Sequence, residues 1–123
     1  MSENFEDLLG KTLVRIDGAE SGHDEITLVT AEGERYRLWH NQDCCENVRV
    51  ADVIGDVRDL LDTPLTLAEE VSNAEGETPE CPDSWTWTFY KLSTIKGSVT
   101  IRWLGESNGY YSESVDFCRL EDA

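Results

Sequence analysis

The sequence predicts an α+β fold, in which an antiparallel β-rich sheet or partly open barrel of about seven strands carries one amphipathic covering helix. Three observations support this prediction. Most apolar residues alternate with polar ones, as in half-buried strands. Short Gly-containing connections separate several of these runs. One stretch, 50–61, changes to the helical period. The stretch 85–118 holds three of the four tryptophans and is expected to form the centre of the fold.

The N-terminal part is expected to contain a short helix and three strands. Residues 2–9 can form the helix, because Ser2 is a suitable N-cap and Gly10 suits the position after the last turn. The apolar pattern then predicts strands at 11–17, 25–30 and 34–40. Gly33 lies in the short connection between the last two, which indicates a hairpin.

The covering helix is expected over 50–61. Its apolar positions follow the i, i+3, i+4, i+7 spacing and are Val50, Val53, Ile54, Val57, Leu60 and Leu61. Pro64 ends this helix, because the residue before a proline avoids the helical region. A strand at 65–72 and an acidic loop at 73–84 are expected to follow.

The C-terminal part is expected to form an antiparallel meander of three strands. Residues 84–89 and 99–104 alternate with period two and are joined across 95–98. The dipeptide Asn108-Gly109 predicts a second hairpin, because both residues tolerate a positive φ angle. The last strand is expected within 110–120.

The chain is strongly acidic, with 26 acidic and 10 basic side chains and a formal net charge of -16. Nucleic acids and anionic membranes repel such a chain, so neither is an expected partner. No apolar run reaches the roughly 18 residues of a membrane span, and the N-terminus lacks signal-peptide features. We therefore expect a cytoplasmic protein, with one domain over 1–123 that is ordered over about 5–120. The acidic excess either serves solubility or forms a surface that docks on a basic partner. Such a surface could bind its partner by imitating nucleic-acid phosphates.

His40, Cys44 and Cys45 are the residues with metal-ligand or nucleophile chemistry. A helical turn would place His40 and Cys44 on one face. However, neighbouring cysteines point to opposite sides of an extended chain, and the usual C-x2-C spacing is absent. A thiol nucleophile is disfavoured as well, because Asp43 and Glu46 would raise the thiol pKa. We expect no metal and no cofactor, with the cysteines reduced and the pair packed at a corner between strand and helix.

The segment 102–114 combines an arginine, aromatic rings, glycines and hydroxyls around one turn. Such a set can bind a planar or phosphorylated small molecule, and Arg102 would contribute most because the chain has few positive charges. The candidate ligand-binding residues are Arg102, Trp103, Asn108, Tyr110, Tyr111, Ser112 and Glu113. The alternative is that the tyrosines cover the sheet and Arg102 pairs with a neighbouring carboxylate.

Four segments of this chain resemble a family of small proteins of unknown function that is encoded mainly in bacteriophage and prophage genomes. They are WHNQDCCENV (39–48), IGDVRDLLDTPLTLAEE (54–70), WTWTFYKLSTIKGSVTIRW (85–103) and GESNGYYSESVDF (105–117). The resemblance implies a viral accessory role and carries no established reaction. The family positions that it implies here are Trp39, His40, Gln42, Asp43, Cys44, Cys45, Glu46, Arg102, Trp103, Asn108, Gly109, Tyr110, Tyr111, Ser112 and Glu113.

The leading hypothesis is a phage accessory protein, not an enzyme, that binds and inhibits a host defence or regulatory protein with a basic surface. The candidate partner-binding residues are Asp43, Glu46, Glu69 and Glu70. An alternative is a protein that sequesters a nucleotide-like molecule with the 102–114 hairpin. A third hypothesis is a metal- or thiol-dependent enzyme that uses His40 with Cys44 or Cys45. Adjacency of 39–46 and 102–113 in space would favour a shared pocket.

Overall fold

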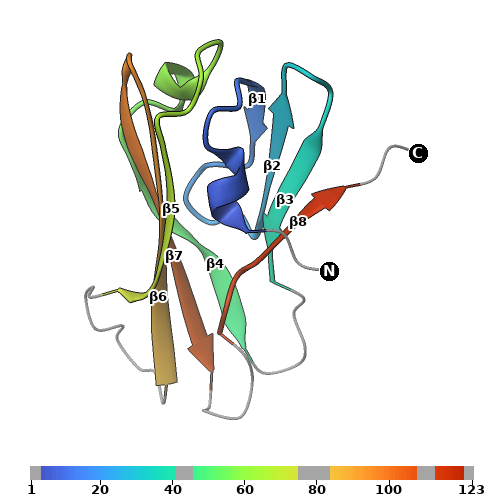
Figure 1. Ribbon diagram of the computed structural model, residues 1–123. Coiled ribbons are helices and arrows are strands. Elements are labelled where there is room, and N and C mark those ends of the chain that lie inside the picture. Colours follow the sequence, from blue (N-terminus) through green and yellow to red (C-terminus); the bar gives the residue numbers. More distant parts are fainter. Residues whose placement is uncertain (1–3, 41–45, 75–83, 108–112, 121–123) are drawn as a thin grey trace.

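Two four-stranded antiparallel sheets face each other in the computed structural model, which describes residues 4–40, 46–74, 84–107 and 113–120 (Figure 1). The first sheet has the strand order β1-β2-β3-β8 and the second has the order β4-β7-β6-β5. A single cluster of buried apolar residues is formed by side chains from both sheets. The described part of the chain is therefore a β-sandwich rather than a closed barrel. The predicted α+β class is wrong.

The elements follow one another along the chain with two single turns of 3-10 helix, labelled η, among the strands. They are η1 (Phe5–Leu8), β1 (Leu13–Asp17), β2 (Glu25–Thr30), β3 (Arg35–Trp39), β4 (Asn47–Ile54), η2 (Val57–Leu60), β5 (Leu67–Ala74), β6 (Ser84–Thr94), β7 (Gly97–Ser107) and β8 (Asp116–Leu120). Within the described ranges, no helix has the length and apolarity needed to cross a membrane.

The stretch expected to form the covering helix is instead most of β4 followed by η2. Val48 and Val50 are fully buried and alternate with polar residues, as strand residues do. The register then shifts between Val50 and Asp52, at a β-bulge. The bulge returns Val53 to the inner side, where it packs against the core opposite Ile101. A bulged strand therefore produced the spacing of three that imitates a helical period, and the β-branched side chains favour the strand.

The last strand belongs to the other sheet. β6 and β7 form the expected hairpin, in which Thr94 pairs with Gly97. β8 pairs with β3, and Phe117 lies opposite Leu38. The chain therefore crosses between the layers after residue 113 (Figure 1). The predicted three-stranded meander is wrong, because turn residues report local geometry whereas the partner of a strand depends on distant packing. The predicted hairpin dipeptide at 108–109 lies outside the described residues.

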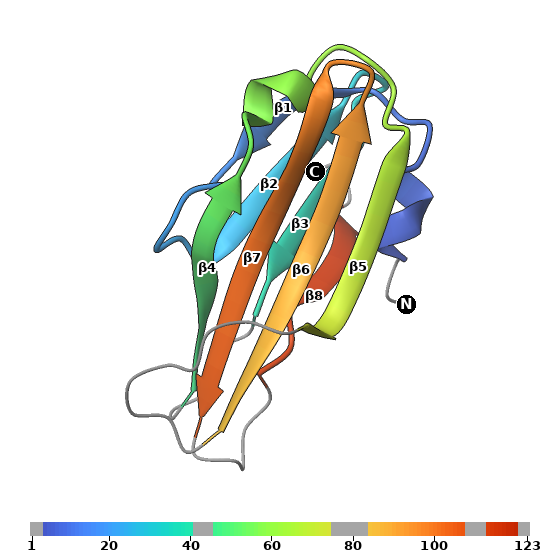
Figure 2. The same cartoon turned by 90° about the vertical axis from the view of Figure 1, so that its left-hand side faces the viewer.

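The expected N-terminal helix is reduced to the single turn η1, which lies beside the edge strand β5 (Figure 2). Phe5 and Leu8 are buried. The Phe5 ring lies 4.7 Å from the Tyr90 ring and 5.3 Å from the Phe117 ring, measured between centroids. Since Tyr90 belongs to one sheet and Phe117 to the other, η1 packs against both layers.

Trp103 is the largest of the fully buried side chains and lies on the inner face of β7. Substituting it with alanine should lower the free energy of unfolding by about 3–5 kcal/mol, because the lost contacts leave a cavity. Trp85→Ala is the matched control, since Trp85 is 40% exposed. Chemical denaturation should show less than about half the loss for the control, in proportion to its smaller buried area. Equal losses would contradict the assignment of Trp103 to the core.

Candidate functional site

The described residues of the predicted ligand site point in different directions. Arg102 lies on the outer face of β7, whereas Trp103 is 0% exposed and faces the core. This follows from strand geometry, since successive side chains point to opposite faces. Glu113 follows β7 in the chain and lies close to the inner face of the second sheet. These three residues do not line one pocket. Asn108, Tyr110, Tyr111 and Ser112 lie outside the described residues.

Arg102 is engaged by its neighbours on the outer face of the second sheet. Its Nε lies 3.2 Å from Oδ1 of Asp52 on β4. Its guanidinium lies 4.6 Å from the ring centroid of Trp87 and 5.3 Å from that of Phe89. Only 15% of the side chain is exposed. Pairing with a neighbouring carboxylate, the alternative weighed from the sequence, is confirmed, and much of the charge of Arg102 is balanced within the protein.

The 39–46 segment and the end of the 102–114 segment meet between the sheets. His40 Nδ1 donates to the carbonyl oxygen of Ser114 over 2.7 Å, since a carbonyl can only accept. His40 Nε2 lies 3.6 Å from Oε1 of Glu46. The side chains of His40 and Glu46 are only 5% and 1% exposed. Glu46 therefore faces the interior and is not available as a docking residue.

Other members of the first segment lie outside the described residues, namely Gln42, Asp43, Cys44 and Cys45. In the part of the chain that the structure describes, no group of three or more His, Cys, Asp or Glu side chains could hold a metal ion. Cys118 lies on β8 as a half-buried free thiol. The meeting of the two segments is thus, in its described part, a buried hydrogen-bonded junction.

Glu113 is held by hydroxyl groups of the second sheet. Thr86 Oγ1 donates to its carboxylate over 2.7 Å, and the hydroxyls of Ser107 and Ser84 donate as well. Burial raises the pKa of Glu113, but the three hydrogen bonds together lower it by more than burial raises it. The pKa of Glu113 is therefore below its ordinary value. The arrangement holds an ionised carboxylate in place, which favours an anchoring role over that of a proton donor.

Gly105 allows the segment that contains Glu113 to approach β7 closely. A Cβ atom at Gly105 would lie 2.4 Å from the carbonyl oxygen of Glu113 and 2.8 Å from its Cβ. Both distances are shorter than real Cβ contacts. The chain therefore passes so closely over β7 that only glycine leaves enough room.

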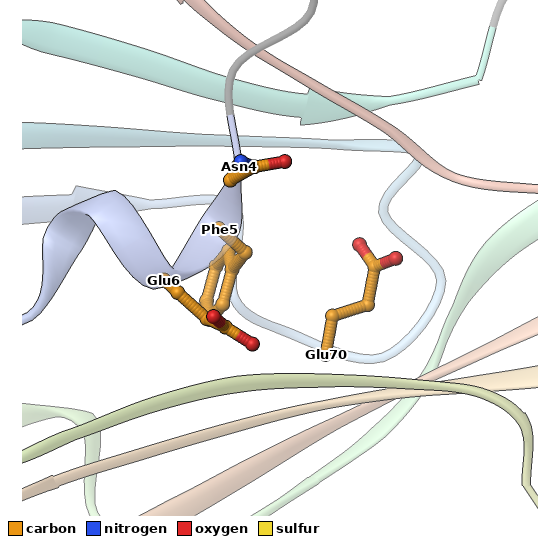
Figure 3. A pocket seen from close by; sticks show the side chains of 4 residues that line it. All are labelled: Asn4, Phe5, Glu6 and Glu70. Atoms are coloured by element: carbon orange, nitrogen blue, oxygen red, sulfur yellow. The ribbon is translucent and has the colours of Figure 1, made fainter.

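A pocket lies on the side of the sandwich where η1 meets β5. It is lined by Asn4, Phe5 and Glu6 from the N-terminal segment and by Glu70 from β5 (Figure 3). Glu6 and Glu70 are exposed. Of the predicted partner-binding residues, Glu70 therefore lines a pocket. Its neighbour Glu69 lies on the other face of β5, opposite Lys91 in the strand register.

A third carboxylate, Asp116 at the start of β8, lies near the same side. Burial is the main cause that raises the pKa of the Tyr90 phenol, and the charge of Glu70, a hydrogen bond to Glu70 and the charge of Asp116 add to it. Glu70 is therefore next to the Tyr90 hydroxyl, and Asp116 is near enough to act on it electrostatically. We call Glu6, Glu70 and Asp116 the acidic edge. Sequence reasoning missed Glu6 and Asp116 as members, because only the docking of η1 and the crossing before β8 bring them to Glu70.

Like Asp24 and Glu32 among the described residues, the acidic edge has no cation paired with it. Among the described residues, none of its three members forms an ion pair within 4 Å. Elsewhere several basic side chains are paired with other acids, including Lys11 with Glu34 at 2.7 Å and Arg49 with Glu106 at 2.7 Å. The negative charge of the edge is therefore directed outward instead of being neutralised within the fold.

Replacing Glu113 with glutamine should lower the free energy of unfolding at neutral pH by about 1 kcal/mol, through its hydroxyl hydrogen bonds. Because the folded pKa is lowered, this contribution is present above the ordinary pKa of 4.5 and is lost as the pH falls through the folded pKa. Denaturation at several pH values should show the difference between wild type and Glu113→Gln narrowing below that range. A difference that is independent of pH would contradict the anchoring role of the ionised form.

Gly105→Ala should destabilise the protein by about 1–3 kcal/mol, because backbone and Cβ atoms of Glu113 block the new methyl group. Gly97→Ala is the matched control on the same strand. The atom nearest to a Cβ at Gly97 is the Asp59 carboxylate oxygen at 2.7 Å, which can move away. Thermal unfolding should place the Gly105 variant clearly below the Gly97 variant, and the reverse order would be inconsistent with the close crossing.

Comparison with known proteins places this chain in a family. Residues 6–117 match the family model described as a domain of unknown function, DUF7448. No curated protein and no solved structure matches the chain. The matched range includes the His40 junction, Glu113 and all three residues of the acidic edge, and it confirms the resemblance to an uncharacterised family. The chain belongs to the DUF7448 family.

Proposed function

We propose that this protein acts by binding a basic protein, with the acidic edge as the contact surface. The observation that carries the proposal is the gathering of Glu6, Glu70 and Asp116 from η1, β5 and β8, with no ion pair among the described residues. The net charge of -16 would attract a basic partner over a distance and speed association. The edge supplies the place where that attraction becomes contact.

The ion pairs of the fold lie on other surfaces than the acidic edge. On the outer face of the second sheet, Arg102 pairs with Asp52 and Arg49 pairs with Glu106. On the first sheet, Glu34 receives both Lys11 and Arg119, at 2.7 and 3.4 Å. Neighbouring carboxylates without a cation repel each other. A basic side chain from a partner would relieve that repulsion at the acidic edge, whereas at Asp52, Glu106 or Glu34 it would compete with an internal cation.

The biological setting that we propose is a bacterial cell infected by a phage. There the protein would occupy the basic surface of a host defence or regulatory protein and thereby inhibit it. The resemblance to small proteins encoded mainly in phage and prophage genomes supports this setting, and the acidity of the chain supports a basic target. Binding by occlusion needs no reaction and no cofactor.

The test is affinity capture from a bacterial host lysate with the wild-type chain and two charge-matched triple variants. Glu6→Gln/Glu70→Gln/Asp116→Asn removes the acidic edge, and Glu20→Gln/Asp24→Asn/Glu32→Gln removes three exposed carboxylates of the first sheet and its loops. We expect a basic protein that binds the wild type and the control variant, is lost from the edge variant, and dissociates between about 50 and 500 mM salt. Equal retention on both variants would refute the acidic edge as the contact surface.

A further inference from the structure

We infer that the outer face of the second sheet binds the same face of a second copy of this chain, so that two sandwiches pack back to back. Figure 2 looks onto this face, with β4, β7, β6 and β5 in front. Glu69 lies on it, whereas Glu70 of the acidic edge lies on the other face of β5. The inference therefore goes beyond the proposed function and leaves the acidic edge uncovered.

Exposed apolar side chains are spread over this face. Ile54 on β4, Leu67 on β5 and Trp85 on β6 are large, and between 38% and 56% of each is exposed. Phe89 lies half-buried near the middle of β6. On the described strands of the first sheet, Val14 is the one large apolar residue that is exposed. Exposed apolar residues gathered on one surface are typical of a contact with another protein.

The charges of this face balance each other. Arg102 lies 3.2 Å from Asp52, Arg49 lies 2.7 Å from Glu106, and Lys91 is opposite Glu69 in the strand register. The whole chain has a net charge of -16, so its excess negative charge lies outside this face. Two copies repel each other through that excess. Contact between two neutral faces keeps the excess charge at the periphery and opposes no charge with a like charge.

Size distinguishes the two outer faces. Ion pairs balance charge on the first sheet as well, including Arg15 with Asp17 and Arg37 with Glu25. However, its strands have only 5 or 6 residues, whereas those of the second sheet have 8 or 11. From the usual rise per residue and strand spacing, the first face covers about 300 Å² and the second about 600 Å².

The larger face has the area that a specific dimer needs. Two copies of it would bury about 1,200 Å² in total, which is at the lower end of stable protein interfaces. The same patch on both copies forms a two-fold contact, the commonest arrangement of identical subunits. Face-to-face packing of sheets is also the geometry by which sandwiches bury apolar side chains.

The test measures the molecular mass by sedimentation over a range of concentrations. We expect wild type to approach twice the 13.9 kDa of one chain as the concentration rises. Thr100→Lys adds a cation at the centre of the face, and Thr27→Lys adds one to the outer face of the first sheet. Both threonines are half-buried, and both changes alter the net charge equally. Thr100→Lys should weaken the dimer by about tenfold or more, because the interface would bury an unpaired charge. Thr27→Lys should stay within about twofold of wild type.

A second pair of variants removes apolar side chains without adding charge, and thus tests the face even if Thr100→Lys fails to fold. Ile54→Ser/Leu67→Ser/Trp85→Ser alters the face, and Leu9→Ser/Val14→Ser/Ile95→Ser removes three exposed apolar side chains outside it. The face variant should lose about tenfold or more in dimer affinity, because it loses buried apolar area. The control variant should still form the dimer.

Salt distinguishes this contact from binding at the acidic edge. Raising the salt from about 50 to 500 mM should strengthen the dimer, because it screens the repulsion between the excess charges. A chain that stays monomeric up to about 1 mM, well above the concentrations at which specific dimers form, would overturn the inference. Equal weakening by a face variant and its control, or a dimer that dissociates at high salt, would overturn it as well. These outcomes leave the proposed function standing, because capture from host lysate with the acidic-edge variant tests that function independently.

Discussion

The crossing of the chain from one sheet to the other before β8 is the constraint on which the rest of the structure depends. Glu113 is fixed to the second sheet by the hydroxyls of Thr86, Ser107 and Ser84. Ser114 then accepts the hydrogen bond of His40 from the end of β3. Within a few residues the chain is thus bound to both layers. Because an antiparallel edge strand needs a partner in register, this crossing determines that β8 joins β3.

The apolar core follows from the same crossing. Phe117 on β8 stacks on Tyr36 with a centroid distance of 5.3 Å and also meets Phe5 on η1. Phe5 in turn packs on Tyr90 of the second sheet. This chain of rings links β3, β8, η1 and β6 and closes one side of the sandwich. A single 3-10 turn is therefore held in place by tertiary packing, since so short a turn has little stability of its own.

The acidic edge lies where these elements meet. Asp116 is the first residue of β8, Glu6 is in η1, and Glu70 belongs to the neighbouring edge strand β5. The crossing and the ring contacts thus bring three like charges to one side of the molecule. Like charges at short range oppose folding, and the buried aromatic contacts beside them offset that cost. Binding of a cation to such a surface is favourable because it relieves this repulsion. That gain in stability is the basis of the proposed function.

The pairing of strands that follow each other in the sequence could be predicted from local patterns. The turn between Thr30 and Glu34 and the β6–β7 hairpin formed as the alternation and the Gly-containing connections predicted. The segment around Val50 was misassigned because one bulge gives apolar residues a helix-like spacing, and only pairing with Ile101 and Trp103 on β7 distinguishes the two. Likewise, the alternation of aromatic and polar residues in β6 correctly predicted a strand. It did not reveal which face of that strand is buried. The aromatic run at Trp87 and Phe89 faces outward, over Arg102, while Tyr90 faces the core.

Amino-acid order therefore determined most of the strands, the described tight turns and the net charge, because these depend on near neighbours or on composition. Tertiary structure alone decided that β8 joins β3, that Arg102 and Trp103 separate, that Glu46 is buried, and that Glu6, Glu70 and Asp116 form one edge. The members of that edge lie 46 to 110 positions apart in the sequence, and His40 and Ser114 lie 74 positions apart. Such contacts result from the packing of whole sheets, so no local period or spacing could reveal them.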